Sequence, residues 1–90
     1  MLFRSAARAW AVRALKNQGF EVLPSKANFI FARHPAITGD ALYAGLRQWG
    51  ILVRHFTKER IKDFVRITIG TQAQMERLAE ALEEMTGGAI

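Results

Sequence analysis

The chain has 90 residues, of which 50% are hydrophobic and 23% are charged, and it carries a formal net charge of +5. This composition is typical of one folded domain and excludes a disordered chain, and no apolar stretch approaches the roughly 18 residues that a membrane span needs. The absence of cysteine excludes disulfides, a thiol nucleophile and thiolate metal ligands, so we expect a single cytoplasmic domain over residues 1–90.

The first half of the chain predicts a helix and two short strands. Residues 2–18 are rich in alanine, and apolar positions recur at helical spacing at Phe3, Ala7, Trp10 and Ala14. Gly19 suits the left-handed position that follows a helix. Residues 20–23 are β-prone and end at Pro24. Residues 27–33 predict a second strand, in which Phe29 and Phe31 share one face, and we interpret both phenylalanines as core residues.

The second half predicts a helix, a hairpin and a final helix. The first of these helices begins at Thr38-Gly39-Asp40 and ends at Trp49, with a stripe of Leu42, Leu46 and Trp49. Residues 51–56 and 64–69 predict two strands, joined by the charged loop 57–63. Thr71 begins the last helix in a capping-box pattern with Gln74, and the apolar stripe of that helix comprises Met75, Leu78, Ala79, Leu82 and Met85. The order α-β-β-α-β-β-α predicts an α+β sandwich, a mainly antiparallel sheet with helices on one side.

Arg54 and Arg66 are the most informative residues, because each lies in a predicted strand among apolar neighbours. If those strands form a hairpin centred on Arg60, the two arginines pair on one face of the sheet. Facing like charges are unfavourable by on the order of 0.2–1 kcal/mol, whereas an anion between them would be held through paired N–H groups. The pattern therefore predicts a site for carboxylate or phosphate. The alternative is that both side chains simply point to solvent.

The other polar residues carry less information. His34 and His55 have no partner at metal-ligand spacing, so we expect no metal site. Asn28 opens a strand, where asparagine is commonly a turn residue. The lysines at 16, 58 and 62 lie in charged surroundings and none resembles a desolvated catalytic lysine. We therefore assign no catalytic residue.

The basic charge leaves a second interpretation open, a free-standing α/β module that binds nucleic acid or a regulatory metabolite. Base-stacking sheets place exposed aromatic rings on central strands beside basic side chains. Only Phe29 and Phe31 fit that pattern here, and the basic residues are scattered along the chain. Nucleic acid is therefore the less favoured partner.

Three segments of the chain are similar to segments of a known family, namely residues 19–29 (GFEVLPSKANF), 50–54 (GILVR) and 64–71 (FVRITIGT). They resemble GF-x-V-x-PS-x-ANF, G-I-L-V-R and L-R-I-T-I-G-T of histidinol-phosphate aminotransferases, which belong to the pyridoxal-phosphate-dependent enzymes of class I and II. The resemblance covers nearly the whole chain in order. It implies the C-terminal small domain of such an aminotransferase.

The resemblance also implies an activity, which is amino transfer between histidinol phosphate and 2-oxoglutarate in histidine biosynthesis. It implies that Arg66 receives the carboxylate or phosphate of the substrate, that Arg54 helps to hold the same group, and that Asn28 lies near the cleft. The family's pyridoxal-phosphate contacts lie in a longer N-terminal part, so we expect this chain to lack the large cofactor-binding domain and to be inactive and without cofactor when alone. A surface that such a large domain would cover favours self-association.

Overall fold

The computed structural model describes residues 2–23, 28–56, 58 and 63–87, with side chains described from Ala6 onward. Several expectations fall outside these residues: the side chain of Phe3, the strand end at Pro24, Lys62 and most of the loop 57–63.

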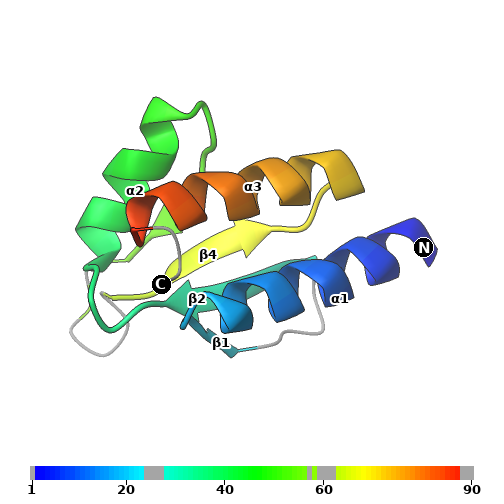
Figure 1. Cartoon of the computed structure of the whole chain (residues 1–90), viewed down its shortest axis with the longest axis horizontal. Coiled ribbons are helices and arrows are strands. Elements are labelled where there is room, and N and C mark those ends of the chain that lie inside the picture. Colours follow the sequence, from blue (N-terminus) through cyan, green and yellow to red (C-terminus); the bar gives the residue numbers. More distant parts are fainter. Residues whose placement is uncertain (1, 24–27, 57, 59–62, 88–90) are drawn as a thin grey trace.

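The described residues form three helices and four strands in the expected order (Figure 1). The helices are α1 (Leu2–Asn17), α2 (Gly39–Gln48) and α3 (Gln72–Met85), and the strands are β1 (Glu21–Leu23), β2 (Phe29–Arg33), β3 (Arg54–His55) and β4 (Val65–Thr68). The strands lie in the order β1-β2-β4-β3, and each neighbouring pair is antiparallel. Figure 1 shows α1 and α3 side by side in front of the sheet. The predicted α+β sandwich is confirmed.

The core lies between the sheet and the helices, because alternate residues of the two central strands point toward the helices. Ile30 of β2 pairs with Ile67 of β4, and Ala32 pairs with Val65, and all four are buried. The helices contribute the buried residues Ala7, Ala11, Leu15, Leu42, Leu46, Met75, Leu78, Ala79, Ala81 and Leu82. Every described helix is too short or too polar to cross a bilayer.

The buried face of α1 differs from the predicted stripe. Ala7, Ala11 and Leu15 are buried, while Trp10 and Ala14 are only partly buried. Residues four apart lie above one another on a helix, so the positions 7, 11 and 15 form the row that meets the sheet. The large ring of Trp10 lies beside this row and packs against the edge of the core.

The interpretation of Phe29 and Phe31 as core residues is wrong. Both are half-buried on the sheet surface that faces away from the helices, and Ile30 between them is the residue that enters the core. Successive residues of a strand point to opposite faces, so the burial of Ile30 against Ile67 directs both phenylalanines outward. Two aromatic rings therefore become available to the open side of the sheet.

Strand β3 is shorter than the predicted strand 51–56, since only Arg54 and His55 pair with β4. The cause lies at the end of α2. Gly50 has a φ of 78°, and the amide of Ile51 donates to the carbonyl of Leu46 at 2.9 Å. This bond holds Ile51 against the helix end, and residues 51–53 do not join the ladder with β4. Leu52 is left 76% exposed.

The capping box at the start of α3 is confirmed. The amide of Gln74 donates to Thr71 Oγ1 at 3.1 Å, and the amide of Thr71 donates to Gln74 Oε1 at 2.9 Å. The glutamine side chain lies over Gly70, where a Cβ atom would collide with Oε1. Glycine at position 70 therefore permits the cap to close between β4 and α3.

Replacing Thr71 with alanine removes one half of the capping box. We expect a loss of about 1 kcal/mol in the free energy of unfolding, which lowers Tm by roughly 4–8 °C in a domain of this size. Gln72→Ala is the matched control, since Gln72 makes only an exposed bond to Glu76 on the same helix. Thermal unfolding followed by circular dichroism measures both, and equal Tm values for Thr71→Ala and the unsubstituted chain would contradict the assignment.

Candidate functional site

The sheet surface that faces away from the helices is termed the open face. Its central row crosses all four strands through the register pairs Leu23 with Phe31, Phe31 with Arg66, and Arg66 with Arg54. The predicted pairing of Arg54 with Arg66 is therefore confirmed as a strand register. Arg66 is half-buried on a central strand, and Arg54 is exposed on the edge strand.

Arg66 cannot turn inward, because its neighbours Val65 and Ile67 are 1% and 2% exposed and occupy the helix side of β4. A guanidinium on that side would lie in the apolar core, where burial of an unpaired charge is strongly unfavourable. Strand alternation and core packing thus direct this side chain to the open face. Arg54 follows from the same ladder, since it is the residue opposite Arg66.

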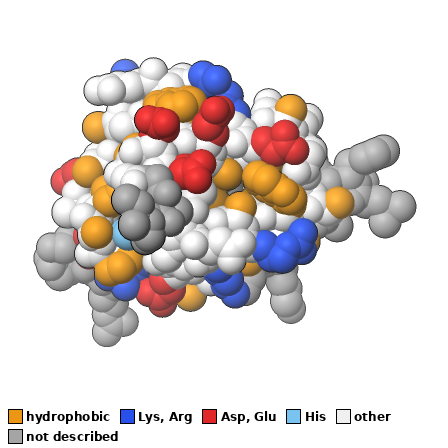
Figure 2. Space-filling model, in the orientation of Figure 1, with side chains coloured by type: hydrophobic (Ala, Val, Ile, Leu, Met, Phe, Trp, Pro, Cys, Tyr) orange, Lys and Arg blue, Asp and Glu red, His pale blue; other side chains and the backbone are white. Residues whose placement is uncertain are grey.

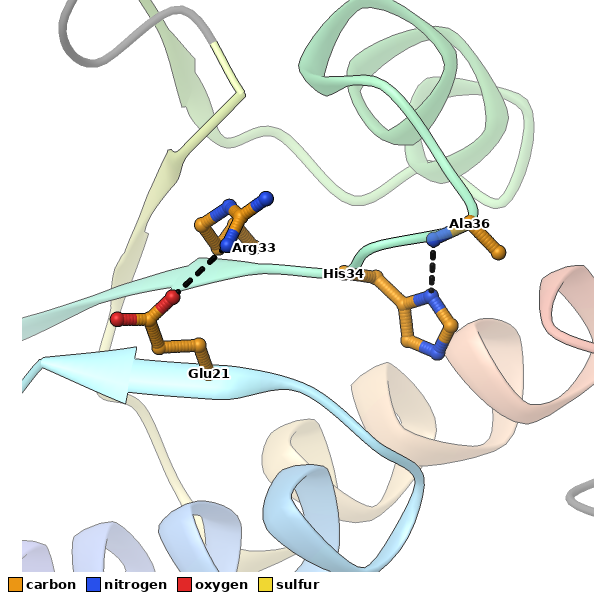
Figure 3. A network of polar contacts seen from close by, with 4 residues as sticks. All are labelled: Glu21, Arg33, His34 and Ala36. Carbon is orange, nitrogen blue, oxygen red and sulfur yellow. Dashed lines mark hydrogen bonds and ion pairs between the residues drawn. The ribbon is translucent and has the colours of Figure 1, made fainter.

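The third arginine of the open face, Arg33, has its charge compensated. Its Nη1 lies 2.9 Å from Glu21 Oε1 on the neighbouring strand β1 (Figure 3). Among the described residues, no carboxylate pairs with Arg54 or Arg66. Two arginines that are paired in the strand register of β3 and β4 therefore have no counter-ion from the described part of the chain.

The acidic side chains gather elsewhere. Figure 2 shows Asp and Glu side chains grouped over α3 on the helix-covered side of the molecule. The glutamates of that helix are exposed, namely Glu76, Glu80, Glu83 and Glu84, as the helical pattern predicts. The helix-covered side is thus acidic along α3 and basic along α1, which carries Arg8, Arg13 and Lys16. The open face carries Arg33, Arg54 and Arg66.

Aromatic rings lie against both arginines. The Cζ atom of Arg66 lies 4.7 Å from the centroid of the Phe29 ring, and that of Arg54 lies 6.0 Å from the Phe56 centroid. The Phe31 centroid lies 5.5 Å from that of Phe29 and 6.0 Å from that of Phe56. Such contacts stabilise a cation by about 0.5–1 kcal/mol at exposed sites. A ring stabilises the cation without accepting a hydrogen bond from the guanidinium N–H groups, as a carboxylate would.

This arrangement can bind an anion and cannot by itself transfer a proton. Guanidinium groups stay protonated and present their N–H donors in a planar fork that matches carboxylate and phosphate. The chemistry available to Arg54 and Arg66 is therefore recognition and charge compensation. The sequence pattern predicts both arginines as site residues but does not predict the phenylalanine rings beside them, because it does not show that β2 and β4 are neighbours in the sheet.

Asn28 lies just before β2 and is exposed. Its backbone oxygen accepts the amide of Ile69 at 2.9 Å, which extends the β2–β4 ladder by one pair. The structure thus brings Arg54 and Arg66 together and leaves Asn28 at the end of the ladder, and a substrate contact for Asn28 stays a prediction.

The two histidines hold loops and strands in place. His34 Nδ1 accepts the amide of Ala36 at 3.1 Å (Figure 3), so Nε2 carries hydrogen and donates to the carbonyl of Gln18, also at 3.1 Å. His55 Nε2 lies 3.1 Å from Asp40 Oδ1, which connects β3 to the first turn of α2. In the described stretches, no three metal-ligating side chains cluster.

Comparison with known proteins identifies the family. The model for aminotransferases of class I and II matches residues 5–82. Over 80 residues the chain is 55% identical to histidinol-phosphate aminotransferase 2 of Rhizobium meliloti and 58% identical to histidinol-phosphate aminotransferase 1 of Bradyrhizobium diazoefficiens, each alignment covering 89% of this chain and 23% of the relative. The solved histidinol-phosphate aminotransferase of Clostridium acetobutylicum superposes with a TM-score of 0.84 at 26% identity, covering 96% of this chain and 27% of that one.

The chain therefore spans about a quarter of the length of the relatives it matches. The family model matches most residues of this chain, and the fold superposes on that of a solved member with a TM-score of 0.84. The chain belongs to the class I and II aminotransferase family.

Proposed function

We propose that this chain is the substrate-anion-binding small domain of an aminotransferase that acts on histidinol phosphate. The observation that carries the proposal is the pairing of Arg54 with Arg66 in the strand register, where neither arginine has a carboxylate partner among the described residues. Identity of 55% and 58% to two histidinol-phosphate aminotransferases supports this substrate. The amino group would pass between histidinol phosphate and 2-oxoglutarate.

One arginine pair can serve both substrates, because each carries an anionic group. Histidinol phosphate has a phosphate and 2-oxoglutarate has carboxylates, and a guanidinium fork accepts either through two parallel hydrogen bonds. Arg66 is the main contact in this proposal, since it is half-buried and lies on the central strand β4, which pairs with β2 on one side and β3 on the other. Arg54, exposed on the short edge strand, is the second contact.

The described residues do not fit a pyridoxal phosphate site. Enzymes of this family depend on that cofactor, which supplies the electron sink for amino transfer and is held through a lysine. The described lysines, Lys16 and Lys58, are both exposed, whereas an imine-forming lysine is desolvated or held beside another cation. We assign the cofactor to the part of the enzyme that this chain does not span, and we assign to the open face the role of closing over the substrate there.

A second candidate is favoured by one observation, the half-buried position of Phe29 and Phe31 on the open face beside arginines. Rings and basic groups in that arrangement stack on the bases of single-stranded nucleic acid. Two features weigh against it: Arg66 lies over Phe29, and Arg33 is neutralised by Glu21. Salt-dependent binding to single-stranded RNA, retained after the loss of Arg66, would favour this candidate over the aminotransferase.

Substituting Arg66 tests the proposed site in a full-length enzyme, for instance one in which this chain replaces the matching segment of the Rhizobium meliloti relative. Arg66→Ala is expected to lower kcat/KM for histidinol phosphate and for 2-oxoglutarate roughly ten- to a hundredfold, since a hydrogen bond to a charged group contributes about 1.5–3 kcal/mol. Arg66→Lys should recover only part, because it keeps the charge and loses the fork.

The matched control is Arg33→Ala, which removes an arginine of the same face whose charge Glu21 already compensates. We expect it to change kcat/KM by less than about threefold. If Arg66→Ala left kcat/KM for both substrates within about twofold of the unsubstituted enzyme, a difference of only ~0.4 kcal/mol, the anion-site assignment would be wrong.

The chain on its own is expected to show no transaminase activity, because its described residues offer no cofactor site. Incubation with pyridoxal phosphate, glutamate and an imidazole keto-phosphate acceptor, followed by detection of 2-oxoglutarate, measures this. Turnover above that of free pyridoxal phosphate would contradict the assignment of the cofactor to another part of the enzyme.

A further inference from the structure

Three phenylalanines form a continuous row beneath the arginine pair. Phe29 and Phe31 lie on β2, and Phe56 follows β3. The rings of Phe29 and Phe31 meet edge to face at 5.5 Å, and those of Phe31 and Phe56 lie 6.0 Å apart at 37°. All three are half-buried. This row is termed the aromatic floor.

We infer that the aromatic floor is the positioning element of the anion site. It holds the guanidiniums of Arg66 and Arg54 by ring faces, at 4.7 Å and 6.0 Å, and leaves their N–H groups without a protein acceptor among the described residues. The inference rests on the proposed function, because the ligand that it serves is the anionic group of the substrate. Phe29, Phe31 and Phe56 act through the arginines and need not touch that group.

Arg33 is an arginine of the same face whose N–H group is occupied by a carboxylate. This arginine also lies near a ring, 5.9 Å from the Phe64 centroid, but a carboxylate oxygen of Glu21 occupies its Nη1 at 2.9 Å. An incoming anion would have to displace Glu21 before it could bind Arg33. A ring attracts the cation through the electrons of its face and accepts no conventional hydrogen bond. Support by rings therefore keeps an arginine in position while its donors stay open.

The aromatic floor also restricts the conformations of the two arginine side chains. Arginine has a long flexible side chain, and a ligand must otherwise order it on binding. The phenylalanine rings have few rotatable bonds and are packed against one another, with Phe29 and Phe31 on the central strand β2. The shorter contact, that of Arg66 with Phe29, predicts that Phe29 contributes more than Phe56.

Binding of inorganic phosphate to the full 90-residue chain tests the inference, with the guanidinium N–H resonances of Arg54 and Arg66 followed by NMR at constant low ionic strength. Phe29→Leu keeps an apolar side chain and removes the ring. We expect the Kd for phosphate to rise about threefold, and about tenfold in the double variant with Phe56→Leu. Phe29→Tyr, which restores a ring, should bind within about 1.5-fold of the unsubstituted chain.

Phe64→Leu is the matched control, because it removes a ring from the same face beside the ion-paired Arg33. We expect its Kd to stay within about 1.5-fold of the original. The inference is overturned if Phe29→Leu binds phosphate as the unsubstituted chain does, if Phe29→Tyr fails to restore affinity, or if Phe64→Leu weakens binding as much as Phe29→Leu. If Phe29→Leu does not fold, Phe56→Leu alone carries the same comparison, with a smaller expected rise.

Arg66→Ala distinguishes loss of the anion site from loss of its support by the rings. If phosphate binding survives Arg66→Ala, the proposed anion site fails, and the floor fails with it. If binding is lost in Arg66→Ala and unchanged in Phe29→Leu, the anion site stands and only the positioning role of the floor is overturned. If Arg66→Ala abolishes binding and Phe29→Leu weakens it, both are supported.

Discussion

The antiparallel pairing of β2 with β4 is the constraint on which the rest of the structure depends. Ile30 opposite Ile67 and Ala32 opposite Val65 fill the space under the helices, and alternation then sends every intervening residue to the open face. A shift of one residue in either strand would turn the apolar set outward and bring Arg66 into the core. The loss of apolar burial and the burial of a charge would both oppose that shift. The register that builds the core is therefore the register that builds the arginine pair.

The same pairing divides the molecule into two chemically different sides. The helix side is apolar within, and its surface is acidic along α3, where Figure 2 shows the carboxylates gathered, and basic along α1. The open side presents Arg54 and Arg66 over phenylalanine rings, with no counter-ion for either among the described residues. Under the proposed function, an anion bound at the open face would supply the counter-charge that the described residues do not give Arg54 and Arg66. Membership of the class I and II aminotransferases is consistent with that proposal.

Local chemistry predicted much of this architecture correctly. The element order, the left-handed Gly19 with φ 94°, the cap of α3 and the pairing of Arg54 with Arg66 in the register all follow from short-range rules of spacing, capping and alternation, and all are found. The errors have a common cause in contacts between elements far apart in the chain. The sequence pattern places Phe29 and Phe31 on one face of a strand but does not show which face the helices cover, so the core assignment of both is wrong. The predicted strand 51–56 is too long, because the composition of that segment does not show that the Ile51 amide bonds to the Leu46 carbonyl at the end of α2.

By itself the sequence determined the elements, the α+β class and the family resemblance, because each depends on residues close together in the chain or on motifs read in order. Only the tertiary structure decided which sheet face is open, that Phe29 lies under Arg66, that Glu21 neutralises Arg33, and that His55 meets Asp40. Each of those contacts joins different strands or a strand and a helix. Their existence depends on the strand order β1-β2-β4-β3, in which the fourth strand inserts between the second and third. Side-chain alternation is a local property, whereas the neighbour that a side chain meets is set by the packing of the whole sheet against its helices.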